Sequence, residues 1–119
     1  MLFRSATCLL TLHFLPPEER RRTVSEIQRR LKPGAPFVAA HFSIPQGESE
    51  RARWLSRYVA FATASGVDPA HVQSARAAID TKLNILTPEQ DEAILREAGF
   101  SNISLFYAGF TFRGWVAYA

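Results

Sequence analysis

The chain has 119 residues, of which 47% are apolar and 12% aromatic, and this composition excludes a disordered segment and indicates one folded domain. Its formal net charge of +3 is far below that of a nucleic-acid-binding tail. A single cysteine, Cys8, excludes an internal disulfide and a four-cysteine zinc site, and it predicts a reducing, cytoplasmic location. No run approaches the roughly 20 apolar residues of a membrane span, so no membrane partner is predicted.

The first half of the chain predicts a strand, a helix and a second strand. Ala6–Leu15 is a nearly unbroken apolar run that ends at two prolines, as in a parallel strand buried on both faces. Glu18–Lys32 has helical periodicity and is stopped by Pro33-Gly34, and Pro36–Ile44 is a second short apolar run. Short connections of this kind predict a βαβ unit with two parallel strands and a right-handed crossover.

Three further helices are predicted after the second strand. Glu48–Ala64 carries an apolar stripe, and Asp68 is placed to cap a helix that begins at Pro69. Thr87 and Gln90 form a capping-box pattern with proline at the first helical position, and they open the last helix.

Two segments near the end of the chain, Ser101–Ala108 and Thr111–Tyr118, are rich in aromatic and β-branched residues and predict a terminal hairpin. We therefore expect an α/β fold of four strands, two parallel and two closing, with helices on both sides of the sheet. The first strand begins at about Ala6, with no element before it to pair along one of its edges. The hairpin could cover that edge, but we favour the interpretation that sequence is missing upstream.

Four segments, taken together in their order and spacing, resemble the C-terminal half of a class I S-adenosylmethionine-dependent methyltransferase. Thr11–Leu15 resembles the end of the family's fourth strand, and Arg29–Val38 resembles its following helix end, Leu-Lys-Pro-Gly turn and fifth strand. Leu95–Phe100 resembles the last helix with its Ala-Gly-Phe exit, and Phe106–Ala117 resembles the closing antiparallel strands. The resemblance implies a partial Rossmann-like methyltransferase sheet, strands four to seven, with flanking helices.

This resemblance also implies the cofactor and its neighbours. S-adenosylmethionine would be bordered by Leu9, Leu10 and Thr11. The family's glycine-rich loop and its ribose-binding carboxylate have no counterpart here, since no Gly-x-Gly-x-Gly occurs. We therefore expect residues 6–119 to be the C-terminal half of a methyltransferase domain, truncated before the glycine-rich motif and inactive alone, and residues 1–5 to be a non-native leader.

A related group, the carboxy-S-adenosylmethionine synthases, shares the fourth-strand pattern and the closing strands. By this resemblance the group needs an arginine for the extra carboxylate just before the last helix. The matching position here is Ala78, with Arg76 two residues away. This departure favours ordinary methyl transfer to an acceptor that the sequence does not identify.

Methyl transfer from a sulfonium needs alignment and sometimes a base. His13 and His41, both near strand ends, are weak candidates for that base, although packing or capping roles are the more usual interpretation. A stripe of Trp54, Tyr58 and Phe61 either packs in the core or contacts an apolar or aromatic acceptor. The three histidines lack metal-ligand spacing, so no metal is assigned.

A basic run predicts either an RNA-binding surface or a solvated helix face. Arg20-Arg21-Arg22 is followed by Arg29 and Arg30, and glutamates lie between them, which favours the solvated face. Two alternatives to an enzyme thus stay open: a small basic RNA-binding module, and a non-catalytic half-domain. The half-domain would bind its missing N-terminal half, or a partner's strand, along the free edge of the first strand.

Overall fold

The computed structural model describes all 119 residues and contains one four-stranded sheet in the order β1-β2-β4-β3. The parallel pair predicted for the βαβ unit is confirmed, because β1 runs parallel to β2. β4 lies antiparallel to both β2 and β3, so the closing hairpin is confirmed as well. The strands are β1 (Ala6–Leu9), β2 (Pro36–Phe42), β3 (Ser101–Gly109) and β4 (Phe112–Tyr118).

Four α-helices and one short 3-10 helix connect these strands. The predicted helix starts at Glu48, Pro69 and Pro88 are confirmed, and the Asp68 carboxylate caps its helix by accepting from the Ala70 N–H. No helix is both long enough and apolar enough to cross a membrane. The helices are η1 (Leu12–Phe14), α1 (Pro17–Arg29), α2 (Glu48–Ala64), α3 (Pro69–Lys82) and α4 (Pro88–Glu97).

The first strand is shorter and more exposed than its apolar run predicts. It ends at Leu9, and Leu10 has a φ of 56°, a left-handed conformation that takes the chain out of the sheet and into η1. Only β2 lies beside β1, and the Leu9 side chain is 55% exposed. The prediction of a strand over Ala6–Leu15 buried on both faces is therefore wrong in its length and in its burial.

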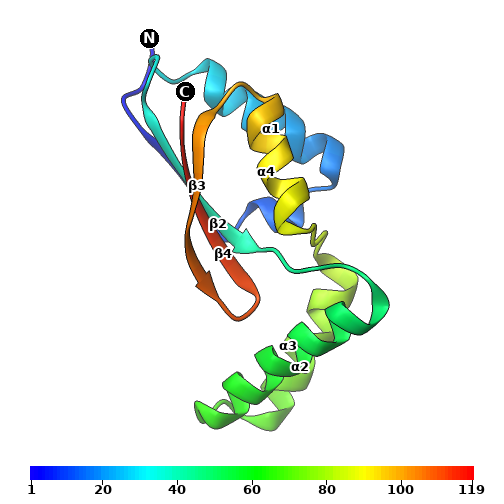
Figure 1. The fold of residues 1–119 in the computed structure, drawn as a ribbon. Helices are drawn as coiled ribbons and strands as arrows, with labels where there is room; N and C mark the ends of the chain where they lie inside the picture. Colours follow the sequence, from blue (N-terminus) through cyan, green and yellow to red (C-terminus); the bar gives the residue numbers. More distant parts are fainter.

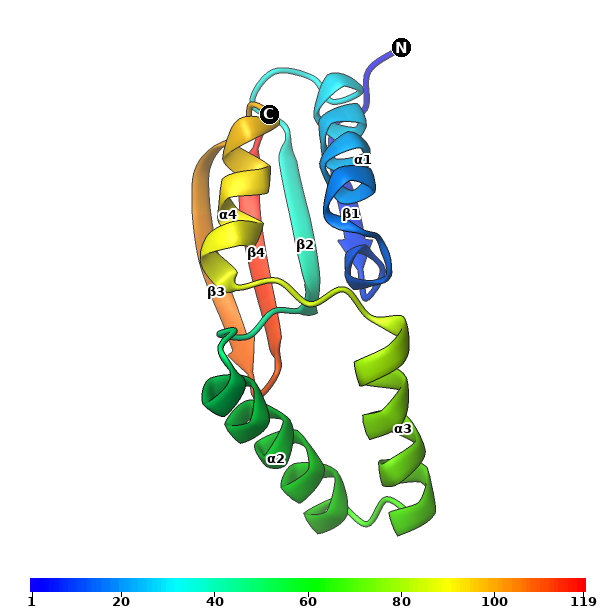
Figure 2. The same ribbon diagram turned by 90° about the vertical axis from the view of Figure 1, so that its right-hand side faces the viewer.

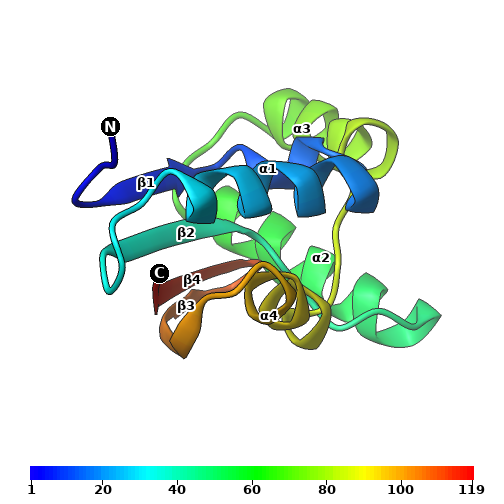
Figure 3. The same ribbon diagram turned by 90° about the horizontal axis from the view of Figure 1, so that it is seen from above.

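Both helices that pack on the sheet lie on the same face of it. Figure 1 shows α1 and α4 together on one side, and Figure 2 shows them side by side in front of the strands. The view from above agrees, and α2 and α3 extend beyond one end of the sheet instead of covering its second face (Figure 3). The expectation of helices on both sides is therefore wrong for this chain.

Two apolar clusters hold these parts together. The larger one joins the covered sheet face to α1 and α4 and includes Phe37, Trp115 and Ile94. The smaller one attaches α2 and α3 to the end of β2 through Phe42, Leu55 and neighbouring residues. Because this second cluster is distinct from the larger one, α2 and α3 form a separate layer at the carboxyl end of the parallel strands.

The second face of the sheet has no helix over it. Successive side chains of a strand point to opposite faces, so Val38 and Ala40 lie opposite the buried Phe37 and Ala39. Phe106 of the edge strand β3 is 59% exposed and lies against Gly114 of β4. The sheet thus presents an apolar surface on its open face and a free edge along β1.

The capping box at the start of α4 offers a test of the local structure. Thr87 Oγ1 accepts from the Gln90 N–H at 3.0 Å, and Gln90 Oε1 accepts from the Thr87 N–H at 2.9 Å. Thr87→Ala removes one of these bonds, so we expect the free energy of unfolding in urea to fall by about 1 kcal/mol. Thr63→Ala, at an exposed position of α2, is the control and should leave the free energy of unfolding nearly unchanged. Equal losses of unfolding free energy in the two variants would contradict the role of the cap.

Candidate functional site at the carboxyl ends of the parallel strands

The carboxyl ends of β1 and β2 meet at the edge of the sheet where ligands bind in open α/β folds. The Leu10 N–H donates to the Ala40 carbonyl at 2.7 Å, and the Thr11 hydroxyl donates to the Leu9 carbonyl at 3.0 Å. These bonds fix the backbone just where it leaves the sheet. The three predicted cofactor neighbours, Leu9, Leu10 and Thr11, lie exposed at this end of the free strand.

His13 lies two residues further on, buried in η1 and facing the end of β2. Its Nδ1 accepts a hydrogen bond from the Phe42 N–H at 3.0 Å, and its carbonyl accepts from the Asn84 N–H at 2.7 Å. Burial, together with the charges of His41 and Arg20, lowers the pKa of His13 to about 4, and Asp91 opposes this only in part. At neutral pH the ring is therefore uncharged, with its proton on Nε2.

A buried ion pair joins the helices beside this site. The Arg20 guanidinium donates to Asp91 Oδ1 at 2.8 Å, and the Ser43 hydroxyl donates to Asp91 Oδ2 at 2.7 Å. The arginine also donates to the backbone carbonyls of Leu15 and Asn84. One buried cation thus connects α1, α4, the end of β2 and the two segments that border the site.

The role of Arg20 was missed in the sequence because it opens a basic run. Both interpretations of that run put Arg20 on the surface, whereas its side chain is 1% exposed. The helical period carried the signal, since Arg20, Val24 and Ile27 fall on one stripe of α1 and the buried Leu31 follows the same spacing just after the helix. A charged residue that begins an apolar stripe needs a buried partner, and Asp91 of the distant α4 is that partner.

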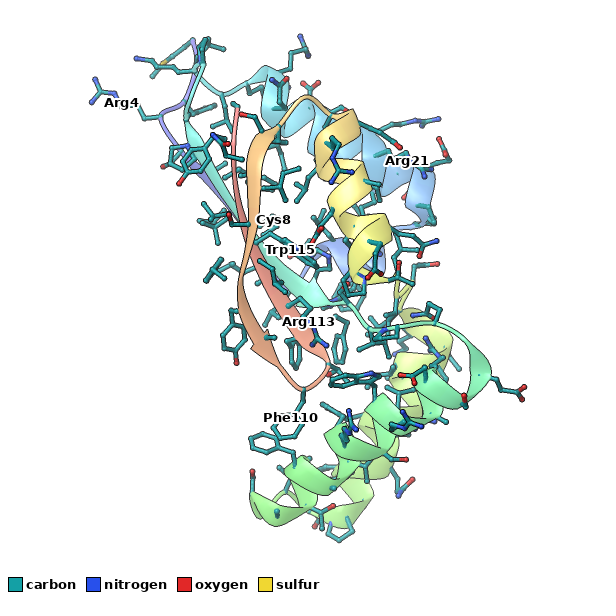
Figure 4. All side chains as sticks on the ribbon, in the orientation of Figure 1. Arg4, Cys8, Arg21, Phe110, Arg113 and Trp115 are labelled. Atoms are coloured by element: carbon teal, nitrogen blue, oxygen red, sulfur yellow. The ribbon has the colours of Figure 1, made fainter.

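His41, the second candidate base, lies in the interior and not at the apolar pocket described below. Its ring is 2% exposed and packs against Trp115 with ring centroids 5.4 Å apart. Its Nε2 lies 3.3 Å from Asp91 Oδ1, and neither ring nitrogen has a hydrogen-bond partner. Figure 4 shows Trp115 in the layer between the sheet and the two helices that cover it, where His41 also lies.

An apolar pocket of about 230 Å³ opens between the strand ends and the α2–α3 pair. Two polar side chains, His13 and Lys82, contribute to a wall that is otherwise apolar. The arrangement is that of a small-molecule site, with a few polar groups in a mainly apolar lining. The lining residues are His13, Phe14, Phe42, Tyr58, Ala75, Ala78, Ile79, Lys82 and Leu83.

The predicted substrate stripe divides between two roles. Tyr58 lines this pocket and a second one of about 350 Å³, which Phe61 and Phe110 also line with their rings stacked 4.6 Å apart. Trp54 lines neither pocket, because the guanidinium groups of Arg57 and Arg113 lie 4.6 and 4.9 Å from its ring centroid. Figure 4 shows Arg113 and Phe110 at the hairpin end next to α2, so Trp54 joins that helix to the hairpin.

The rest of the basic run forms surface ion pairs. Arg21 pairs with Glu18 at 2.7 Å and points away from the body of the protein (Figure 4). Glu26 pairs with both Arg29 and Arg30 at 2.7 Å, and these hydrogen bonds lower the pKa of the Glu26 carboxyl. The outer face of α1 thus carries positive and negative side chains next to one another.

Comparison with known proteins identifies the fold of this chain. No protein-family model matches the chain. Human N-acetylserotonin methyltransferase superposes with a TM-score of 0.63 and 16% identity, over 97% of this chain and 29% of that one. An O-methyltransferase-like protein from Nostoc punctiforme gives a TM-score of 0.63 and 17% identity, over 99% of this chain and 32% of that one. The chain has a methyltransferase fold. It holds strands four to seven of a Rossmann-like methyltransferase sheet, as its sequence predicts.

Sequence comparison gives a second group of relatives. The carboxy-S-adenosyl-L-methionine synthase of Chromohalobacter salexigens is 32% identical over 91% of this chain, and that of Actinobacillus succinogenes is 29% identical over 90%. The chain spans 40% of the first relative's length and 44% of the second's. The similarity of this chain therefore covers less than half of the length of each of these two relatives.

Breaking the buried ion pair tests its contribution to this methyltransferase fold. Asp91→Asn leaves the Arg20 charge buried without a carboxylate, so we expect a loss of about 3–5 kcal/mol in urea unfolding. Asp80→Asn removes an exposed partner of Arg76 and should cost less than about 1 kcal/mol. The double variant Arg20→Met/Asp91→Leu should recover much of the loss, and a loss as large as that of Asp91→Asn would contradict this account.

The low pKa of His13 predicts a pH-dependent stability. Because the folded pKa of about 4 lies below the usual 6.5, the unfolded chain binds a proton that the folded chain excludes. The contribution of neutral His13 to the free energy of unfolding is complete above pH 6.5 and is lost as the pH falls toward 4. We expect the urea midpoint to fall across this window, and His13→Asn to flatten the fall. An unchanged slope in the variant would contradict the assignment to His13.

Proposed function

We propose that this chain forms the acceptor side of an S-adenosylmethionine-dependent methyltransferase domain. The observation that carries the proposal is the apolar pocket at the carboxyl ends of two parallel strands, in a sheet with the methyltransferase strand order. Transfer from a sulfonium requires an acceptor held in line with the departing sulfur. A pocket next to the cofactor edge, bordered by strand ends whose backbone is fixed by hydrogen bonds, can provide that alignment.

The residues at the end of β1 fit one wall of a cofactor site. Leu9 and Leu10 present exposed apolar side chains there, and the left-handed Leu10 turns the backbone away from the sheet. The chain has no Gly-x-Gly sequence through which a backbone could approach the cofactor. Leu9, Leu10 and Thr11 therefore supply packing for S-adenosylmethionine, and its ribose and carboxylate contacts come from another polypeptide segment.

The acceptor in this proposal is a small, mainly apolar molecule. Tyr58 and Phe14 give the pocket aromatic walls, and Ala78 presents only a methyl group where the carboxy-transferring relatives would need an arginine. Arg76 does not replace it, because its guanidinium donates to Asp80 at 2.7 Å on the outside of α3. This lining favours methyl transfer over chemistry on a carboxylated cofactor.

The sequence relatives support a second candidate, synthesis of carboxy-S-adenosylmethionine. One feature of the pocket favours it: Lys82 provides a cation in the wall that could pair with a carboxylate. Mass spectrometry of the cofactor product separates the two reactions. Methyl transfer yields S-adenosylhomocysteine and a methylated acceptor, whereas the second reaction takes a carboxyl group from a carboxylate-donating co-substrate and yields a carboxylated cofactor.

The chain would act together with a polypeptide that supplies the remaining strands. The free edge of β1 and the open apolar face of the sheet support this part of the proposal, because parallel sheets are normally covered on both faces. A non-catalytic half-domain would use the same edge. RNA binding receives little support from the paired charges on α1.

Calorimetry tests the proposed division of the cofactor site. The chain alone should not bind S-adenosylmethionine at micromolar concentrations, because it lacks the groups that hold the ribose. The part of the Chromohalobacter salexigens relative that precedes the matched region, added at equal concentration, should form a complex that binds the cofactor. Micromolar binding by the chain alone, or a stable complex that binds none, would contradict the proposal.

A further inference from the structure

We infer that His13 acts in the apolar pocket as a fixed hydrogen-bond donor through its Nε2–H, and that the pocket takes an apolar, ring-sized molecule with an oxygen acceptor at that point. The inference rests on the proposed function, and it deepens it by stating which polarity the acceptor molecule must present. It also excludes His13 as the base, since a ring that carries its proton on Nε2 has no lone pair to offer there.

The tautomer follows from the contact with β2. A backbone N–H can only donate, so the bond from Phe42 N to His13 Nδ1 requires a lone pair on Nδ1. The neutral ring then carries its proton on Nε2. The Asn84 N–H also donates to the His13 carbonyl, and this bond fixes the backbone that carries the ring.

The free nitrogen is the one polar atom of this ring that remains available. His13 is 3% exposed, yet its Nε2 has no hydrogen-bond partner and is not among the side-chain atoms that are sealed from solvent. The ring lines the pocket together with Phe14 and Phe42, whose centroids lie 4.7 and 5.2 Å from its own. The two phenyl rings restrict its rotation, so the donor has a fixed direction.

The charges around His13 keep it neutral. Arg20 of α1 and His41 of β2 disfavour a proton on the ring, whereas Asp91 of α4 favours one, and Asp91 is already paired with Arg20. Lys82 of α3 also lines the pocket, and its side chain is exposed to solvent. Burial and the charges of His41 and Arg20 place the pKa of His13 near 4, so protonation of this ring plays no part at neutral pH.

Nitrogen NMR of the free chain tests the tautomer without cofactor or activity. With ¹⁵N-labelled histidine, we expect His13 to show a proton-bearing Nε2 and an unprotonated Nδ1 between pH 6 and 8. His71, exposed at the start of α3, is an internal control whose ring should show both neutral tautomers. A proton on Nδ1, or titration of His13 near pH 6.5, would overturn the inference even if cofactor binding is confirmed.

Two probes of similar shape test the ligand polarity. Acetophenone has a carbonyl acceptor and ethylbenzene has none, and both match the apolar body of the pocket. Acetophenone should shift the His13 Nε2 resonance and bind at least five-fold more tightly than ethylbenzene. Equal binding of the two probes, or no effect at His13, would overturn the proposed polarity.

A pair of uncharged variants separates donor from base. The glutamine amide of His13→Gln can place a donor near the Nε2 position, whereas the shorter His13→Asn can only replace the Nδ1 acceptor. We expect His13→Gln to keep most of the five-fold preference for acetophenone and His13→Asn to lose it. Loss in both variants while both stay folded by circular dichroism would overturn the donor role. If either variant unfolds, the nitrogen spectrum of the unmodified chain decides.

Discussion

The buried pair of Arg20 and Asp91 is the interaction on which the arrangement of the site depends. It is the one arginine–carboxylate pair of the chain with both side chains sealed from solvent, at 1% and 3% exposure. Its two members come from α1 and α4, 71 residues apart, so it forms only when both helices lie on the same sheet face. A buried charge without its partner is costly, and this cost selects that arrangement over looser ones.

The same arginine also positions the segments that line the pocket. Its bonds to the Leu15 and Asn84 carbonyls hold the end of η1 and the exit of α3, and Asn84 in turn donates to the His13 carbonyl. The pocket is thus bordered by backbone that is fixed from the protein interior. The walls contributed by α2 and α3 depend on a smaller apolar cluster, so ligand-induced movement should be concentrated in those helices.

Local signals in the sequence predicted much of the fold. Proline and capping residues predicted the starts of α3 and α4, an apolar stripe predicted α2, and the apolar runs predicted the parallel pair and the closing hairpin. The end of β1 was not predictable from its composition, because apolar residues continue through η1 and only the left-handed Leu10 marks the change. The one-sided helix layer was also missed, since periodicity shows that a helix has a buried face but does not show which sheet face receives it.

The candidate site could be predicted only in part. The resemblance to methyltransferases led to the strand ends, to His13 and to Tyr58, all of which lie at the carboxyl end of the sheet. The interior position of His41 and the two guanidinium groups against Trp54 depend on contacts between distant segments. Local sequence patterns do not predict contacts between residues that lie far apart in the chain. Arg20 is the intermediate case, because its place on the apolar stripe was visible but its partner was not.

Hydrogen exchange gives the most direct test that cofactor binding uses the carboxyl end of β1. The chain would be measured in complex with the N-terminal part of its Chromohalobacter salexigens relative, with and without S-adenosylhomocysteine. We predict that the ligand slows exchange at residues 9–14 and leaves the far edge strand, Ser101–Gly109, unchanged. Protection confined to the far strand, or ligand binding with no change at residues 9–14, would contradict the account.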